Sequence, residues 1–569
     1  MYYESLTFSK GNCSLRYKVL TKINKNKRFY HFPMSVNEEI LNKNKLDQAT
    51  NFIKLNDFKK AKEILLELAN KNILDPTVYL NLAFINFQKG EKDEMQEILI
   101  KAVNLGIRNT DIFTNLGNIF FQKRNFDQAI IFFKEAINSK PDNFNVHYNL
   151  GCLFIEKKDY ANAKNFFKNA LKINPNFAKA YNNLGTIYQF QGDLNTAEIY
   201  FLKALKINPK NLTTLTNLAL LFREQGNLKK AKSYLEKVLK INPNFPEARF
   251  NLSMLQFLSN NFTAGWVNYQ WRWRLNNQHD AIQIYARPQA KEWIGEKLNP
   301  GEKLFIASEQ GLGDTIQFMR YIPYLRKKGI HISFCAQTKL HQLIKESEIS
   351  NNPLHPKKEK FNFDGKWAPL LSLPKYLNVD SSNPVVKSPY LKINKDRISY
   401  WKNIFSNEKK PIIGINWQGK LRTEENNHIL KGRSMPLEFF SRLTCIDNFK
   451  FLSLQHGYGS EQIANCSFKE KFVDFQGKIN ESVDFVEKAA IILNCSIIIT
   501  TDTSIAHLSG ACGKKTLLLL KKVPDWRWGI KGKKTFWYEN MELFRQKEKN
   551  NWQEVMDRVL IRLEDILNS

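Results

Sequence analysis

The sequence has few of the features that would direct it out of a reducing, aqueous compartment. Its seven cysteines, in a chain of 569 residues, are widely spaced and never form a Cys-x-x-Cys pair. Such spacing is typical of reduced thiols, not of a disulfide framework. No run of eighteen apolar residues occurs, and the first thirty-five residues hold no apolar stretch of signal-peptide length. We therefore expect a soluble cytoplasmic protein, at most peripheral to the inner membrane.

Several motifs of phosphate and metal chemistry are also missing. Gly311-Leu312-Gly313 has no third glycine at the dinucleotide-binding spacing, and two glycines in Gly510–Thr516 lie too close together for a P-loop. The sequence has neither an Asp-x-Asp pair nor a His-Glu-x-x-His motif, so we expect no metal ligands and no cofactor. A bound diphosphate would then be neutralised by helix N-termini and basic side chains.

Acidic residues are in the minority. The sequence has 85 Lys and Arg against 55 Asp and Glu, a formal net charge of +30. Such an excess attracts phosphates, nucleotides and anionic membranes alike. The lysines are scattered and no aromatic signature of an RNA-binding module accompanies them, so we expect no nucleic-acid partner. The length exceeds that of a single core and predicts about three or four folding units.

A period of 34 residues organises the first half of the chain. Pro141, Pro175, Pro209 and Pro243 follow this spacing, and each ends an apolar helical stretch. The same register contains small and large apolar residues at Leu116-Gly117, Leu150-Gly151, Leu184-Gly185, Leu218-Ala219, Phe120, Phe154, Tyr188, Phe222, Ala129, Ala163, Ala197 and Ala231. This pattern is typical of the tetratricopeptide repeat, in which small residues lie where two helices touch and proline ends the second helix. With weaker flanking copies, about six or seven units are expected.

An asparagine recurs in the same register, on the first helix of each unit. The positions are Asn81, Asn115, Asn149, Asn183, Asn217 and Asn251. Amides at regular spacing on the concave face can hydrogen-bond the backbone of an extended peptide. This arrangement resembles the asparagine ladder of the eukaryotic O-linked N-acetylglucosamine transferase, so Asn115, Asn149, Asn183 and Asn217 are candidate acceptor-binding residues. The alternative is that asparagine is simply common at this position of the repeat.

Composition suggests how the two halves are delimited. A basic tail at 1–35 precedes an α-helical solenoid at 36–275, whose end, Trp266–Arg274, concentrates tryptophan and arginine. We interpret that end as a capping helix, with base stacking as the alternative. A linker is expected at 276–300.

From Lys303 onward the sequence has the period of short strands and amphipathic helices. A strand at Lys303–Ser308, a glycine-bearing turn and a helix at Thr315–Lys328 predict the start of a βαβ unit. A second series starts at Pro411, with strands expected at 412–417, 449–455, 496–501 and 516–520. We therefore predict two Rossmann-like α/β lobes, at 301–405 and 406–569, with ligands bound between the carboxyl ends of their strands.

Two segments of this half resemble the heptosyltransferase-like glycosyltransferases. Gly311–Pro323 looks like their first-lobe turn, and Asp502–Lys514 is similar to their Asp-Thr-x-x-x-His-Leu motif. Trp417–Gly419, Arg433–Leu437 and Pro524–Trp528 extend the likeness over residues 293–560. The resemblance, strongest to bacterial repeat proteins with such a domain, implies a GT-B fold and sugar transfer from a nucleotide-diphosphate donor. The first lobe would hold the acceptor and the second the nucleotide sugar.

The resemblance also implies roles for individual residues. Asp314 would be the general base that takes the proton of the acceptor hydroxyl; an ordinary helix cap is the alternative. His507 would contact the donor diphosphate, with a structural histidine as the alternative. The full set of donor-binding candidates, which includes a base or ribose contact from Gln455 at a strand end, is Gly313, Lys420, Arg433, Gln455, Asp502, Thr503, Ser504 and His507.

Three functions remain open at this point. The first is a metal-independent glycosyltransferase that modifies a protein recruited by the repeats. The second is an enzyme acting on lipopolysaccharide or another lipid-linked glycan, with the positive charge favouring peripheral contact with an anionic membrane. The third is a non-catalytic repeat scaffold whose transferase domain is degenerate.

Overall fold

The computed structural model describes residues 36–275, 284–357, 360–420, 424, 431–481 and 484–568. The predicted basic tail at 1–35, which includes Cys13, lies outside the described residues. The chain divides into two compact units, one ending at Thr214 and one running from Leu215 to Ser569. The predicted domain limit at residue 275 is therefore not the limit between the units, because the last repeats belong with the α/β half.

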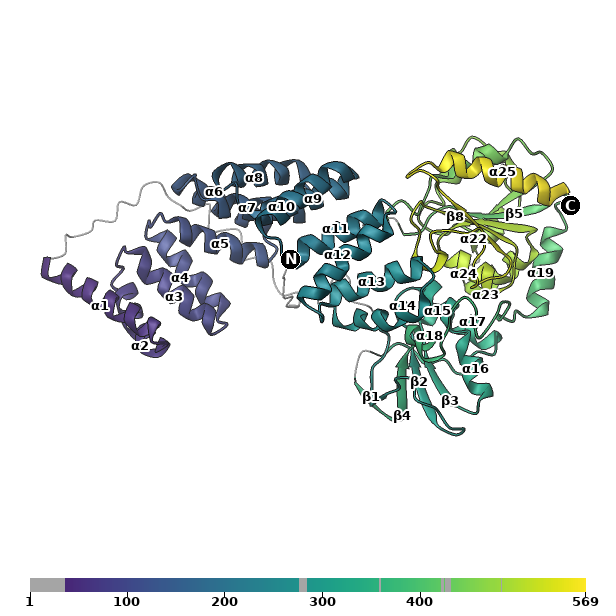
Figure 1. Cartoon of the computed structure of the whole chain (residues 1–569), viewed down its shortest axis with the longest axis horizontal. Coiled ribbons are helices and arrows are strands. Elements are labelled where there is room, and N and C mark those ends of the chain that lie inside the picture. Colours follow the sequence, from purple (N-terminus) through teal and green to yellow (C-terminus); the bar gives the residue numbers. More distant parts are fainter. Residues whose placement is uncertain are drawn as a thin grey trace. The chain divides into compact units, whose positions relative to one another are not determined.

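Within residues 36–275, the helices form seven consecutive pairs, a number inside the predicted range. Figure 1 shows these pairs as successive hairpins. Their bounds are α1 (Val36–Lys54) and α2 (Phe58–Asn70), α3 (Pro76–Gln88) and α4 (Lys92–Asn104), α5 (Thr110–Gln122) and α6 (Phe126–Ser139), α7 (Phe144–Glu156) and α8 (Tyr160–Ile173), α9 (Ala178–Gln191) and α10 (Leu194–Ile207), α11 (Leu212–Glu224) and α12 (Leu228–Ile241), and α13 (Pro246–Leu258) and α14 (Phe262–Tyr269).

The repeated polar residues set where the second helices begin. Asn125, Asp159 and Asp193 are the N-caps of α6, α8 and α10, and each side chain accepts a hydrogen bond from the backbone amide three residues later. The caps satisfy amides that have no partner inside the helix. The same helices end two residues before the repeated prolines. The prediction that the second helix of each pair ends at the repeated proline is thus confirmed for these three helices.

The repeated glycines mark close contacts between the two helices of a pair. A Cβ atom added at Gly151 would lie 2.5 Å from the ring of Phe167, and one added at Gly185 would lie 2.7 Å from the ring of Phe201. Protein interiors are packed too closely to admit such an atom without movement. The period therefore records a packing requirement and not only a helical pattern.

The first sheet of the second unit has four parallel strands in the order β1-β4-β2-β3. Their bounds are β1 (Pro288–Glu292), β4 (Phe361–Pro369), β2 (Lys303–Ala307) and β3 (His331–Cys335). Strand β1 corrects the prediction of a linker at 276–300. Its sequence Pro-Gln-Ala-Lys-Glu has no apolar alternation, because only one end of this edge strand is buried.

The helix predicted at 315–328 is divided into α15 (Leu312–Phe318) and α16 (Tyr321–Lys327). Pro323 has no amide hydrogen to donate to the carbonyl of Met319, so the regular pattern is interrupted there. At the break, the Nε of buried Arg320 donates to the carbonyl of Gln317 at 2.7 Å.

The second sheet has five parallel strands in the order β6-β5-β7-β8-β9. Four of them confirm predicted strands: β5 (Ile412–Asn416), β6 (Lys450–Ser453), β7 (Ile497–Thr501) and β8 (Thr516–Leu520); β9 (Met541–Arg545) was not predicted. Helix α25 (Trp552–Asn568) packs Val555, Val559 and Leu563 into the core of this sheet. In Figure 1 it lies along the sheet near β5 and β8.

The remaining elements are short helices around the two sheets. The segment after Ser434 forms the 3-10 helix η4 (Leu437–Leu443). The others are η1 (Gln270–Arg274), η2 (Thr338–Leu340), α17 (His341–Glu346), η3 (Leu370–Ser372), α18 (Leu373–Tyr376), α19 (Lys395–Phe405), α21 (Gln462–Asn465), η5 (Lys469–Lys471), α22 (Gln476–Glu481), α23 (Phe485–Asn494), α24 (Ser504–Ala511) and η6 (Trp526–Trp528). No described helix is long and apolar enough to cross a membrane.

One hydrophobic core joins the last helix pair to both sheets. The ring centroids of Phe257 and Trp526 are 4.4 Å apart, and the indole Nε1 of Trp266 donates to the carbonyl of Val379 at 2.7 Å. Large aromatic rings dominate the energetics of such contacts. Helices α13 and α14 are therefore part of the body that contains the α/β sheets.

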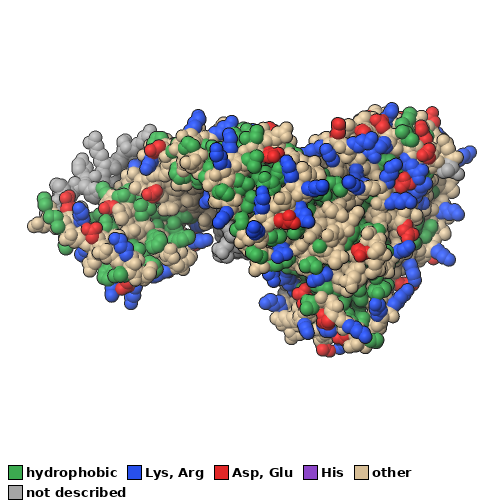
Figure 2. All heavy atoms as spheres, in the orientation of Figure 1, with side chains coloured by type: hydrophobic (Ala, Val, Ile, Leu, Met, Phe, Trp, Pro, Cys, Tyr) green, Lys and Arg blue, Asp and Glu red, His purple; other side chains and the backbone are tan. Residues whose placement is uncertain are grey.

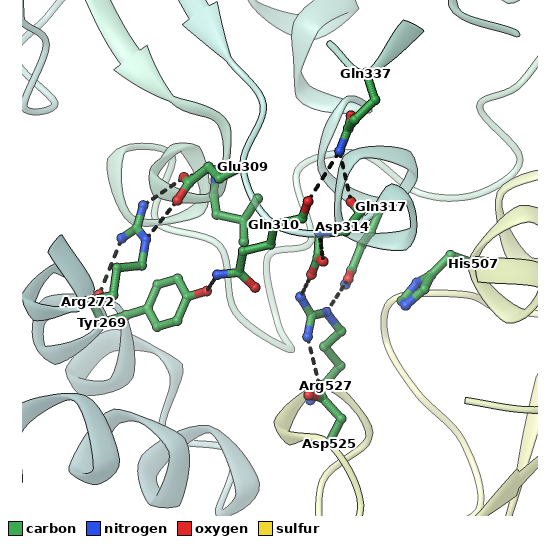
Figure 3. Close-up of polar contacts among 12 residues, drawn as sticks. Tyr269, Arg272, Glu309, Gln310, Asp314, Gln317, Gln337, His507, Asp525 and Arg527 are labelled. Carbon is green, nitrogen blue, oxygen red and sulfur yellow. Dashed lines mark hydrogen bonds and ion pairs between the residues drawn. The ribbon is translucent and has the colours of Figure 1, made fainter. Parts of the chain in front are cut away.

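A buried ion pair fixes η1 to the first sheet. Arg272 donates from Nε to Glu309 Oε2 at 3.0 Å and from Nη2 to Glu309 Oε1 at 2.8 Å, and both side chains have exposed fractions of 0%. The same Nη2 donates to the Ser372 hydroxyl, and Glu309 accepts from the amide of Leu371. Figure 3 shows the pair beside the candidate site.

Figure 2 shows how the basic residues are distributed on one face of the molecule. Lys and Arg side chains lie across that face, with Asp and Glu side chains among them. The visible surface therefore carries its positive charge in a dispersed form.

Candidate functional site

The candidate site lies where α15, which follows β2, meets α24, which follows β7. A Cβ atom added at Gly313 would lie 2.7 Å from Cδ2 of His507 and 3.5 Å from Cα of Ser504. The structure thus brings together the two segments that carry the family resemblance. In Figure 3, Asp314 and His507 lie on these two neighbouring helices. Both helices start at the carboxyl ends of parallel strands, where α/β sheets bind their ligands.

Asp314 uses both carboxylate oxygens within the protein. Oδ2 accepts a hydrogen bond from the amide of Gly311 at 2.8 Å, and Oδ1 is paired with Arg527. Asp314 therefore caps α15 from the third helical position, while Gly311 occupies the cap itself. Burial raises the pKa of Asp314, and the positive charge of Arg527 opposes that rise. Asp314 is therefore not the N-cap that the alternative interpretation expected, although its side chain caps the helix from N3, and its role as a base remains a prediction.

Sequence reasoning missed Arg527. Its guanidinium contacts Asp314, donates from Nη1 to Asp525 Oδ1 at 2.8 Å, and donates from Nε to Gln317 Oε1 at 2.7 Å (Figure 3). Pro524–Trp528 is part of the family resemblance, but the sequence assigned no role to Arg527. An arginine next to an aspartate in a segment that resembles the family was the signal available.

His507 is a buried, neutral side chain. Its exposed fraction is 6%, its ring stacks on Trp528 with centroids 5.4 Å apart, and its Nδ1 lies 3.0 Å from the hydroxyl of Tyr538. Burial, assisted by the charges of Arg527, Arg320 and Arg433, holds the pKa of His507 well below its usual range. His507 can therefore exchange a hydrogen bond with a diphosphate, but it brings no positive charge to one.

The residues that open α24 are held against the sheet. The Thr503 hydroxyl accepts a hydrogen bond from the amide of Ile505 and donates to Asn416 Oδ1 at 2.9 Å. Thr503 is thus the N-cap of this helix, and Ser504 is its first residue. Asp502 follows β7 directly. Burial and the neighbouring Asp525 raise the pKa of Asp502 to about 6, and Arg433 opposes them.

Gln455 does not fit the predicted role as a nucleotide contact. Its Oε1 accepts hydrogen bonds from Asn416 Nδ2 and from the amides of Trp417 and Gln418, at 2.8 to 3.3 Å. Its Nε2 donates to the carbonyls of Gln418 and Tyr458. The amide is buried and fully used in holding the loops after β5 and β6, so we correct that prediction.

The two predicted cations differ in their surroundings. Arg433 donates from Nε to buried Glu424 at 3.0 Å, and its charge acts on Asp314, Asp502 and His507. Lys420 is exposed, next to residues 421–423, which lie outside the described part. Arg433 is therefore part of the cluster, while the role of Lys420 remains a prediction.

The repeated asparagines use part of their hydrogen-bonding capacity between neighbouring repeats. Nδ2 of Asn149 donates to Asn118 Oδ1 at 3.0 Å, and Nδ2 of Asn183 donates to the hydroxyl of Tyr148 at 3.3 Å. Each bond joins first helices of successive pairs. This gives the asparagines a structural role, and peptide binding by them, with Asn115 and Asn217, remains a prediction.

We expect the raised pKa of Asp502 to make stability depend on pH. The folded protein holds this proton up to pH of about 6, whereas the unfolded chain loses it near 3.9. The folded form therefore binds more protons in this interval, and the contribution of Asp502 to the free energy of unfolding falls as pH rises through it. The variant Asp502→Asn has no such proton to lose. Its free energy of unfolding minus that of wild type should therefore be up to about 3 kcal/mol larger at pH 7.5 than at pH 4.

Urea unfolding followed by tryptophan fluorescence checks this prediction. All eleven tryptophans lie between Trp266 and Trp552, so the signal reports on the second unit alone. Asp474→Asn, at an exposed aspartate, is the matched control. If the difference in free energy of unfolding between Asp502→Asn and wild type stays constant with pH, the pKa of Asp502 is not raised in the folded protein.

Comparison with known proteins identifies the repeats. Models of the tetratricopeptide repeat match residues 76–105, 144–177 and 176–244, and a model named TPR repeat matches 117–154. Among curated proteins, the chain is similar to protein FlbA of Caulobacter vibrioides, with 23% identity over 348 residues. That match covers 56% of this chain and 56% of FlbA, so the chain spans about half of that relative.

Two solved structures resemble parts of the chain. A tetratricopeptide repeat protein from Parabacteroides merdae has 17% identity and a TM-score of 0.36, covering 42% of this chain and 94% of its own. PilF from Pseudomonas aeruginosa has 18% identity and a TM-score of 0.33, covering 37% and 97%. The matched models show that residues 76–244 carry tetratricopeptide repeats, a module that presents extended binding surfaces.

Proposed function

We propose that this protein is a glycosyltransferase of GT-B type that transfers a sugar from a nucleotide-diphosphate donor to a protein held by the repeats. The observation that carries the proposal is the contact between Gly313 and His507. This contact places the start of α15, which contains Asp314, beside the start of α24, which follows Asp502. One helix follows a strand of the first sheet and the other follows a strand of the second sheet. An acceptor hydroxyl and a donor could meet at that junction.

The charges at the junction support metal-independent chemistry. The acceptor oxygen forms a bond to the anomeric carbon as the bond from that carbon to the diphosphate oxygen breaks. Asp314 would take the hydroxyl proton on Oδ1, once Arg527 turns from it toward Asp525 or the leaving group. Arg433 and the N-terminus of α24 would stabilise the negative charge that develops on the diphosphate.

The repeats support a protein acceptor. Tetratricopeptide arrays generally bind peptides or proteins, and one structure similar to this chain, YrrB, is described as having an unusual peptide-binding site, at 21% identity over 32% of this chain. On Asn149, the amide hydrogen not used between repeats could pair with the backbone of an extended peptide, whereas Nδ2 of Asn183 donates to both Tyr148 and Cys152.

A screen of nucleotide sugars tests the proposal. Purified full-length protein, with and without EDTA, is incubated with UDP-, GDP-, ADP- and CDP-sugars, and release of nucleoside diphosphate is measured. We expect turnover of one donor class that EDTA leaves unchanged. Intact-mass shifts on co-expressed proteins would identify a protein acceptor, whereas labelled glycolipid without such shifts would favour a lipid-linked acceptor. Turnover of no donor would reject the proposal.

A scaffold without catalytic activity is the second candidate. The observation in its favour is that Gly311 and Arg527 already occupy both oxygens of Asp314. In that case the protein would capture the same partners through its repeats with every donor absent. Simultaneous replacement of Asn149 and Asn183 by alanine would weaken this capture in either case, so the donor screen distinguishes the two candidates.

A further inference from the structure

One arginine of the repeat region is buried without a matching hydrogen-bond acceptor. Arg223 lies in the last turn of α11, its exposed fraction is 9%, and its Nη1 has no hydrogen-bond partner among the described residues. A buried guanidinium nitrogen without a partner is costly, because it has lost water and gained nothing in exchange. Such a group in a native structure points to a missing anionic partner.

The end of α11 lies against the loop that follows β8. A Cβ atom added at Gly226, directly after this helix, would be 3.8 Å from Cγ2 of Val523. Lys521, the first residue after β8, donates from Nζ to the carbonyl of Lys431 at 3.2 Å. Burial, and then the charge of Arg223, lower the pKa of Lys521 to about 8. Two cations are thus held close together at the carboxyl end of a central strand.

The acids in this neighbourhood are largely committed to other cations. Glu224 is paired with Lys549 at 2.7 Å, and Asp525 is paired with Arg527 at 2.8 Å. Asp502, at the start of α24, also acts on Lys521, and its own pKa is raised by burial. Glu224 and Asp525 also act on Arg223 and Lys521, yet Arg223 Nη1 has no hydrogen-bond partner among the described residues. In this largely buried place charge interactions are strong.

We propose that Arg223 and Lys521 form a binding site for a diphosphate group, with the guanidinium of the repeat helix as one of its ligands. Guanidinium groups match phosphate oxygens in geometry, and a lysine adds a point charge. The site adjoins the start of α24, whose backbone amides favour the same anion. Identification of the diphosphate as that of the sugar donor rests on the proposed function. The helix pair α11 and α12 would then contribute directly to donor binding.

Titration calorimetry with inorganic pyrophosphate and full-length protein tests the site without requiring turnover. We expect Arg223→Gln to weaken pyrophosphate binding at least tenfold. Arg223→Lys should bind with an affinity between those of wild type and Arg223→Gln, and Lys521→Gln should also bind more weakly than wild type. Arg442→Gln is the matched control, because Arg442 is half-exposed and paired with Asp557. Binding by wild type should weaken as pH rises above 8, since Lys521 then loses its proton.

The outcomes separate this inference from the proposed function. No binding of pyrophosphate by wild type, or equal binding by wild type, Arg223→Gln and Lys521→Gln, would overturn the site. Loss of binding in Arg442→Gln as well would show a nonspecific effect of charge and overturn it too. Binding that depends on Arg223, with no turnover of any nucleotide sugar, would uphold the site and reject the enzyme. Parallel titration of UDP, GDP, ADP and CDP would then show whether a nucleotide supplies the diphosphate.

Discussion

Replacement of Asp314 by asparagine is expected to lower donor turnover by 10²–10⁴-fold while the protein stays folded. Asparagine has nearly the same size, and its Oδ1 can still accept the hydrogen bond from the amide of Gly311 that caps α15. It cannot accept a proton at neutral pH. The variant therefore removes the proposed base and preserves the cap, which an alanine would not. Release of nucleoside diphosphate and transfer to the acceptor are the measurements.

Asp314→Asn also weakens the ion pair between Asp314 and Arg527, so the effect of that ion pair needs a separate control. Asp525→Asn removes the other carboxylate that contacts Arg527 and leaves Asp314 in place. We expect it to reduce turnover much less than Asp314→Asn. Equal losses in the two variants would mean that Asp314 acts by positioning Arg527. Turnover by Asp314→Asn at the wild-type rate would show that Asp314 has neither role and that another group takes the proton.

Breaking the buried pair of Arg272 and Glu309 is expected to destabilise the second unit by about 3–5 kcal/mol. In Arg272→Met, Glu309 would keep only the amide of Leu371 among its partners, as an unpaired carboxylate in a site closed to water. Urea unfolding followed by tryptophan fluorescence measures the loss in this unit alone, because the first unit contains no tryptophan.

The double variant Arg272→Met/Glu309→Gln completes the cycle. We expect it to be less destabilised than Arg272→Met, because a neutral amide tolerates burial better than an unpaired carboxylate. The conservative variant Arg272→Lys should retain the charge but lose the two parallel hydrogen bonds. Its stability should therefore lie between those of wild type and Arg272→Met. Losses in the single variants that simply add in the double variant would show that the two groups do not stabilise one another.

The repeats could be predicted from sequence because their determinants are local. A cap such as Asp159, a small residue such as Gly151 and a proline such as Pro175 each act within one helix pair, so they recur at a fixed distance. The central strands could be predicted for the same reason, being short and almost wholly apolar. Strand β1 could not, because its place depends on pairing with β4, far along the chain.

The candidate site was predictable in part. The family resemblance selected Gly313, Asp314 and His507, and the structure brings these residues together. It could not reveal that Gln455 is used up by backbone groups of two loops, since those bonds exist only after folding. The contact of Arg527 with Asp314 joins positions from the two lobes and has no periodic or local signature.

The last helix pair differs from the repeats before Thr214, because its aromatic side chains pack into the core of the second unit. Insertion or deletion of a whole 34-residue repeat before Thr214 would leave the core of the second unit intact. A shortened chain that began at residue 276 would lack Phe257 and Trp266, and would expose to water the faces of Trp526 that they cover. Such a fragment should aggregate, because each buried aromatic ring removes 150–250 Å² from water. The number of repeats before Thr214 can therefore change without loss of these aromatic contacts, whereas the last helix pair cannot be removed without exposing Trp526.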